Sequence, residues 1–155
     1  MTDEQLFAQD WLNRMYHFEN KLAANVRSRE KVLGSLSGIG KYDAEFIPTQ
    51  SGENATETKL LEFSRLSEII EKDALILLKE DNRTRAVIEK IGDTPDDEIM
   101  KAVLIDRYVN RLKWEEVGRL HNYSTQRTKQ LHDKALTKIV PYIPKNETLD
   151  EIRRN

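Results

Sequence analysis

Large apolar side chains recur at helical spacing along the first part of the chain. Between Gln5 and about Leu36 there is no proline and Gly34 is the only glycine, so the pattern predicts one continuous helix. Glycine, proline and small polar residues then gather between Ser35 and Glu53, which predicts a loop. The apolar stripe of this first helix consists of Leu6, Leu12, Met15, Phe18, Leu22 and Val26.

A second long helix is predicted from Ala55 or Thr56 to Ile91, and Gly92 suits its C-terminal end. Each of the two helices has one apolar stripe, so neither is expected to be stable without a partner. We expect residues 1–92 to form an antiparallel helical hairpin, either a plain pair or a coiled coil, that serves oligomerisation or partner binding. The buried side of the second helix is expected to hold Leu60, Phe63, Leu66, Ile70, Ile76, Leu77, Val87, Ile88 and Ile91.

Three shorter helices are predicted in the last part of the chain, which makes the expected fold class all-α. The segment Thr94–Glu98 combines a capping hydroxyl, a proline at the first helical position and three acidic residues, a strong signal for a helix start. Residues 93–140 are expected to form one domain and residues 141–155 a C-terminal tail. The three helices are predicted from Pro95 to about Asn110, from Trp114 to Leu120, and from the cap Ser124 to about Ile139.

The last two of these helices, joined by a three-residue turn, have the lengths of a helix-turn-helix motif. Such a motif needs an apolar inner side on each helix and a small residue where the helices approach, and Gly118 suits that place. The inner side is expected to hold Trp114, Val117 and Leu120 in one helix and Leu131, Ala135, Leu136 and Ile139 in the next, with Tyr123 beneath the turn.

The opposite face of the last helix carries short polar and basic side chains, which are the groups that read base edges or bind phosphates in double-stranded DNA. Trp114 is expected to belong to the core and not to form a platform for a ligand. The expected DNA-binding residues are Ser124, Thr125, Gln126, Arg127, Lys129, Gln130 and Lys134, together with Arg119 of the preceding helix.

Net charge divides along the chain in a way that supports this interpretation. Residues 1–106 hold 14 Lys and Arg against 21 Asp and Glu, a net charge of −7, whereas residues 107–138 hold 8 against 3, a net charge of +5. This asymmetry indicates a polyanion-binding segment on an acidic body. Cysteine is absent and the three histidines share no metal-binding spacing, so neither a metal site nor a cofactor is expected.

The remaining signals bear on location. The longest apolar run, Ala74–Leu78, is far too short to span a bilayer, and the acidic start of the chain has no apolar core of a secretory signal. We therefore expect a cytoplasmic protein that makes no contact with a membrane.

The segment from Val103 to Ile139 resembles region four of the primary bacterial sigma factors, which reads the −35 promoter element. The strongest pieces are WEEVGRL (Trp114–Leu120) and STQRTKQLHDKAL (Ser124–Leu136). Over nearly its full length the chain is similar to small sigma-like regulators of Gram-positive phages and prophages, of the autolysin-regulatory and late-transcription activator type. The resemblance implies base reading by Thr125, Gln126, Lys129 and Gln130. Because the pair Thr125-Gln126 stands where sigma factors have Arg-Glu, the −35 consensus is not expected as the target.

The function expected from the sequence is that of a non-enzymatic, sequence-specific transcription regulator, a homodimer that activates phage late genes together with the host RNA polymerase. No segment resembles the sigma region that melts promoter DNA, so promoter opening is expected to come from the polymerase. An alternative is a phage DNA-packaging protein of the small terminase type, which also joins a helix-turn-helix to oligomerising helices. An enzyme is not expected, since no nucleophile–base pair, phosphate-binding loop or metal cluster is visible.

Overall fold

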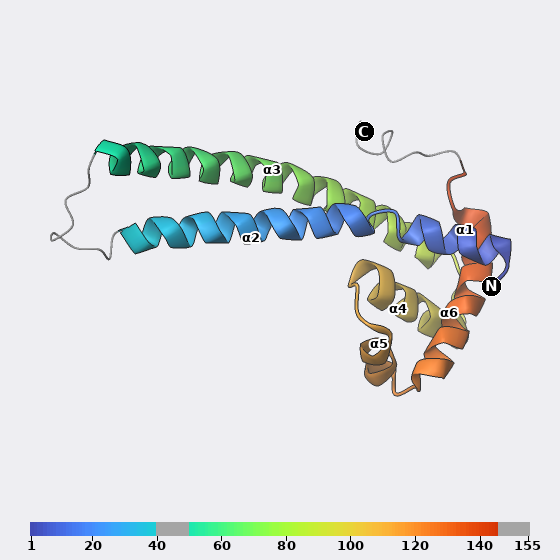
Figure 1. Ribbon diagram of the computed structural model, residues 1–155. Helices are drawn as coiled ribbons and strands as arrows, with labels where there is room; N and C mark the ends of the chain where they lie inside the picture. Colours follow the sequence, from blue (N-terminus) through green and yellow to red (C-terminus); the bar gives the residue numbers. More distant parts are fainter. Residues whose placement is uncertain (40–49, 146–155) are drawn as a thin grey trace. The chain divides into compact units, whose positions relative to one another are not determined.

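The computed structural model describes residues 1–39 and 50–145 (Figure 1). The part of the chain that it describes is helical and contains no strand, which confirms the predicted all-α fold class. The elements are α1 (Asp3–Leu12), α2 (Tyr16–Ile39), α3 (Gln50–Glu89), α4 (Pro95–Leu104), the π-helical turn η1 (Ile105–Val109), α5 (Trp114–His121), α6 (Thr125–Ile139) and the 3-10 turn η2 (Val140–Tyr142).

The chain divides into two compact units, one of Met1–Met15 with Leu78–Asn155 and one of Tyr16–Leu77. The prediction of a single helix from Gln5 to Leu36 was therefore wrong at one point, because α1 ends at Leu12 and α2 begins at Tyr16. At this break the N–H of Arg14 donates to the carbonyl of Trp11, three residues earlier, so the helical ladder tightens and stops. The sequence contains no proline or glycine there that would have signalled the break.

Helix α6 contacts α1, α4 and α5 in the first unit. The core cluster of this unit takes buried apolar side chains from α1, the end of α3, α4, η1 and α6, which is an arrangement of helices packed around one shared interior. The residues of this core are Ala8, Trp11, Leu12, Val87, Ile88, Ile91, Met100, Leu104, Tyr108, Ala135, Leu136, Ile139 and Ile143.

The second unit consists of α2 and the first part of α3, which lie side by side (Figure 1) and are joined by a 2.6 Å hydrogen bond from Lys59 Nζ to Ser35 Oγ. In each helix one row of buried and half-buried positions is spaced alternately by three and four residues, the spacing of a coiled-coil seam. The positions are Phe18, Leu22, Asn25, Arg29, Val32 and Leu36 in α2, and Thr56, Lys59, Phe63, Leu66, Ile70, Asp73 and Leu77 in α3.

Three apolar side chains that were expected on buried stripes are exposed instead, namely Leu6, Leu60 and Leu120, with exposed fractions of 43%, 53% and 61%. Leu6 lies off the buried face of the short α1, and Leu60 falls between two seam positions of α3. In α5 the inward place is taken by His121, whose Nε2 lies 2.8 Å from Oδ2 of Asp106. Leu120, one residue earlier, is rotated by about 100° and faces solvent.

The turn between α3 and α4 depends on Gly92, which has φ 144°, a backbone conformation that side chains rarely adopt. The space that a Cβ atom would need at this residue is filled by the carboxylate of Asp97. Asp97 also completes a capping box with Thr94 at the start of α4 and pairs with Lys138 of α6 at 2.5 Å. The hydrogen bond from Lys138 lowers the pKa of Asp97.

The approach of α5 to α6 depends on Gly118, as the sequence predicted. A Cβ atom at this position would lie 2.7 Å from the carbonyl oxygen of Tyr123 and 3.1 Å from Oγ1 of Thr128. Asn122 ends α5 in the left-handed conformation, with φ 59°, and the N–H of Tyr123 donates back to the carbonyl of Gly118 at 2.8 Å. A side chain at residue 118 would therefore push the turn away from α5.

We predict that Gly118→Ala lowers the free energy of unfolding by about 1–3 kcal/mol, because the added methyl group meets backbone that cannot rotate away. The matched control is Gly34→Ala in α2, where nothing lies within 4 Å of the added atom. This control should be neutral or should stabilise by about 0.5–1 kcal/mol, since alanine is the better helix former. Urea unfolding followed by circular dichroism measures both, and equal effects of the two substitutions would contradict the steric role of Gly118.

Candidate nucleic-acid interface

Ser124 caps the start of α6, as predicted, and local hydrogen bonds fix this start. Ser124 has an extended backbone, and its Oγ accepts from the N–H of Arg127 at 3.1 Å. The hydroxyl of Thr128 donates to the carbonyl oxygen of Ser124 at 2.9 Å. The first turn of α6 is thus held in place by residues of the turn itself, and every later side chain of the helix takes its direction from there.

The inner face of α6 matches the predicted stripe and also includes two polar residues that sequence reasoning missed. Leu131, Ala135, Leu136 and Ile139 are buried as expected, and Thr128 and His132 are buried beside them. Thr128 is accommodated because its hydroxyl is satisfied by the backbone of its own helix. The spacing of these two residues, four apart and in line with the apolar stripe, was the available signal.

The outer face of α6 brings together most of the residues predicted to bind DNA. Gln126, Lys129 and Gln130 follow the i, i+3, i+4 spacing of one helix face, and Arg127 and Lys134 lie two turns apart beside them. Within the described part of the chain, the side chains of Gln126, Arg127, Gln130 and Lys134 make no hydrogen bond or ion pair. Exposed in the structure are Ser124, Gln126, Arg127, Lys129, Gln130 and Lys134, together with Arg119 of α5, whereas Thr125 is half-buried.

Trp114 was expected in the core, and the structure corrects this, because its side chain is only half-buried. The guanidinium carbon of Arg107 lies 4.5 Å from the centre of its ring, and the Nζ atom of Lys129 lies 5.9 Å from it. Trp114 is the first residue of α5, and at a helix end no preceding turn covers the side chain. The indole therefore lies between the buried interior and the exposed face of α6.

Behind Trp114 lies a buried polar cluster built on His132. Its Nε2 is 2.5 Å from the hydroxyl of Tyr108, and its Nδ1 is 3.0 Å from Oδ1 of Asp133. Burial lowers the pKa of His132, and burial raises the pKa of Tyr108 to about 12. Both groups are thus neutral at pH 7, so the Tyr108 hydroxyl donates to Nε2 while the Nδ1–H of His132 donates to the Asp133 carboxylate.

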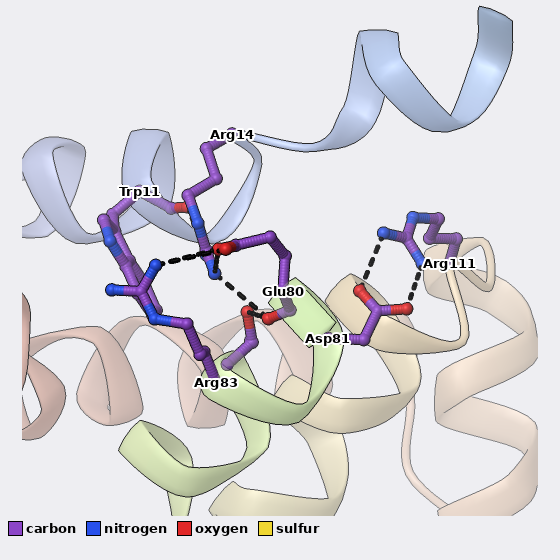
Figure 2. Close-up of polar contacts among 7 residues, drawn as sticks. Trp11, Arg14, Glu80, Asp81, Arg83 and Arg111 are labelled. Carbon is purple, nitrogen blue, oxygen red and sulfur yellow. Dashed lines mark hydrogen bonds and ion pairs between the residues drawn. The ribbon is translucent and has the colours of Figure 1, made fainter. Parts of the chain in front are cut away.

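A second polar cluster joins the end of α3 to the segments before α2 and α5 (Figure 2). Figure 2 shows Glu80 between Arg14 and Arg83, and Asp81 facing Arg111. A guanidinium nitrogen of Arg14 and one of Arg83 each lie 3.0 Å from Oε2 of Glu80. The distance from Nη2 of Arg111 to Oδ1 of Asp81 is 3.1 Å. Glu80 is only 2% exposed. Burial raises the pKa of Asp81 to about 6, although nearby arginines act in the opposite direction. Since Arg111 closely precedes α5, its pair with Asp81 helps to fix where that helix begins.

The described residues contain neither a candidate metal site nor a helix that could span a membrane. In the described residues, no group of three or more His, Cys, Asp or Glu side chains is placed to hold a metal ion. None of the helices in residues 1–39 and 50–145 has both the length and the apolar character needed to cross a membrane.

Comparison of the chain with protein-family models, with curated proteins and with solved structures found no match.

We predict that His132 makes the first unit less stable in acid. Its pKa is lower in the folded protein than in the unfolded chain, where it is about 6.5, so its contribution is complete above about pH 6.5 and is lost as the pH falls toward the folded value. The groups around it are Tyr108, Asp133, Trp114 and Arg107. Urea unfolding at about pH 7.5 and about pH 5 should show a smaller acid-induced loss for His132→Gln than for the wild type.

The control for this measurement is His17→Gln, which replaces an exposed histidine of α2. Asp81 affects the free energy of unfolding with the opposite sign, because its pKa is raised in the folded protein. Its stabilising contribution is complete below about pH 3.8 and is lost as the pH rises through about 6. Both variants retain Asp81, so the comparison isolates His132. An identical acid-induced loss in wild type and His132→Gln would show that His132 is not the group responsible.

Proposed function

We propose that this chain binds double-stranded DNA in a sequence-specific manner, through a helix-turn-helix formed by α5 and α6. The observation that carries the proposal is the division of α6 into a buried apolar face and an exposed face of amide and basic side chains. An α-helix of this kind fits the major groove of B-form DNA, with its N-terminal residues nearest to the base edges. In this arrangement α6 is the recognition helix.

The side chains of the exposed face have the chemistry that base reading requires. The amides of Gln126 and Gln130 can both donate to and accept from adenine, and the ammonium of Lys129 can donate to guanine O6 and N7. Arg127, Lys134 and Arg119 extend the face on its flanks, where they are suited to phosphate oxygens. Ser124 and Thr125 lie at the start of the helix, within reach of the backbone of the same groove.

The charge distribution supports the same orientation. The segment 107–138 carries a net charge of +5 and residues 1–106 a net charge of −7. The positive segment attracts the phosphate backbone and releases counterions on binding, while the acidic part is repelled. DNA should thus approach the protein by α5 and α6 and not by α2 or α3.

We further propose that the protein is a transcription regulator, an activator of phage late genes that acts with the host RNA polymerase in the bacterial cytoplasm. The support is the resemblance of Val103–Ile139 to sigma region four, which reads promoters but does not melt them. The heptad spacing of α2 and α3 and the exposed leucines of these helices support a hairpin that makes a homodimer. Light scattering distinguishes this dimer from the ring that a small terminase-like packaging protein would form on DNA.

We predict that Gln126→Ala, Lys129→Ala and Gln130→Ala each weaken binding to the cognate sequence by about 1–3 kcal/mol, and binding to random DNA much less. The probe is a short duplex recovered from a random pool by selection with the wild-type protein. Fluorescence anisotropy measures both affinities, and Lys21→Ala, an exposed lysine of α2, serves as the control of equal charge change. Equal losses on both kinds of DNA would make these residues phosphate contacts and not base readers.

We predict that the protein stimulates transcription from a late promoter only when the polymerase carries its own sigma factor. A helix-turn-helix selects a site but provides no stacking surface for unpaired bases, which an open promoter requires. A run-off assay compares core polymerase and holoenzyme, each with and without the protein. Transcripts from core polymerase plus this protein would identify it as a sigma factor in its own right.

A further inference from the structure

The indole of Trp114 is half-buried, and its ring lies near Lys129 on the exposed face of α6. Two cations lie near this ring, Arg107 at 4.5 Å and Lys129 at 5.9 Å from its centre. Both distances are within the range of a cation–π attraction. Lys129 is exposed and belongs to the face assigned to DNA, whereas Arg107 belongs to η1 and is half-buried.

Trp114 is itself held in place from the interior. The ring of His132 meets the indole edge-on, with centres 4.7 Å apart and planes at 82°. His132 is in turn fixed by Tyr108 and Asp133, as described above. On the other side, Arg107 is fixed by a 2.9 Å hydrogen bond from its Nη1 to the carbonyl oxygen of Leu112. A run of contacts therefore leads from the buried polar cluster to an ammonium group at the surface.

We propose that Trp114 is a positioning residue for DNA recognition, whose ring places the Lys129 ammonium before DNA arrives. The proposal rests on the DNA-binding function proposed above. A lysine has a long, flexible side chain, and ordering it on binding reduces affinity. The nearby fixed ring restricts the Lys129 side chain in the free protein. The side chain therefore loses less conformational entropy when DNA binds.

A positioning tryptophan and an ordinary core tryptophan can be told apart by which measured properties change when the residue is substituted. Loss of a core residue lowers stability and weakens binding to every DNA alike. Loss of a positioning residue leaves the charge of Lys129 in place, so the salt dependence of binding stays the same while discrimination between sequences falls. Lys129→Ala, by contrast, removes a charge and should reduce the slope of log K against log salt by about one if that charge contacts a phosphate.

The first test uses the wild-type protein without DNA. Ring currents of an indole move the resonances of protons that lie over it, so the ε-methylene protons of Lys129 should be shifted upfield in the NMR spectrum. The same protons of Lys134, which has no ring contact in the described residues, provide the reference. Identical ε-methylene shifts for Lys129 and Lys134 would overturn the proposal, whatever any variant does.

The second test is a double-mutant cycle on the selected duplex. Trp114→Leu should weaken binding about threefold to tenfold, the range expected for ordering one flexible side chain. In the Lys129→Ala background the same substitution should have almost no effect, and in the Lys134→Ala background it should keep its full effect. Trp114→Phe, which retains an aromatic face, should recover much of the affinity and tests the proposal even if Trp114→Leu does not fold.

The outcomes separate this proposal from the function on which it rests. If wild-type protein binds the selected duplex and the Trp114–Lys129 cycle is additive, the positioning role is wrong and the proposed function stands. If wild-type protein does not prefer the selected duplex to random DNA, the proposed function fails and the positioning role fails with it.

Discussion

Helix α6 has to meet two physical demands with the same fifteen residues. One face supplies buried apolar side chains to the core that α6 shares with α1, α3, α4 and η1, and that burial is what holds the unit together. Once the inner face is committed to the core, the direction of every outer side chain is determined by helical geometry. The backbone positions from which the exposed glutamine, lysine and arginine side chains project are therefore fixed by the core beneath them.

Around this helix, two buried polar side chains, Glu80 and His132, are held by partners that satisfy them. Glu80 lies between two arginines, and His132 lies between a hydroxyl and a carboxylate. Removing one partner from such a cluster leaves an unsatisfied group in the interior, which costs several kcal/mol, about 3–5 for an ionic pair. The Glu80 cluster connects α3 to the segment before α2, and the His132 cluster connects α6 to η1.

What could be predicted from the sequence was mainly what local geometry controls. Ser124 at a helix start, Gly118 at a close approach and the apolar stripe from Leu131 to Ile139 follow from capping, size and periodicity. The turn after Leu12 could not be predicted, because residues 1–15 belong to a unit whose other parts begin more than sixty residues later. Leu120 faces solvent and His121 faces inward because His121 pairs with Asp106, a residue fifteen positions earlier, and such a pair is not visible in the spacing of apolar residues.

The Gly92 turn has a consequence for how this sequence can vary among its descendants. The carboxylate of Asp97 occupies the volume that any side chain at residue 92 would need, and the same carboxylate caps α4 and pairs with Lys138 of α6. The residues at 92, 97 and 138 thus constrain one another, although they lie in a turn and in two separate helices. A lineage that acquires a side chain at 92 should also have replaced the acid at 97, and should then have lost its constraint on a lysine at 138.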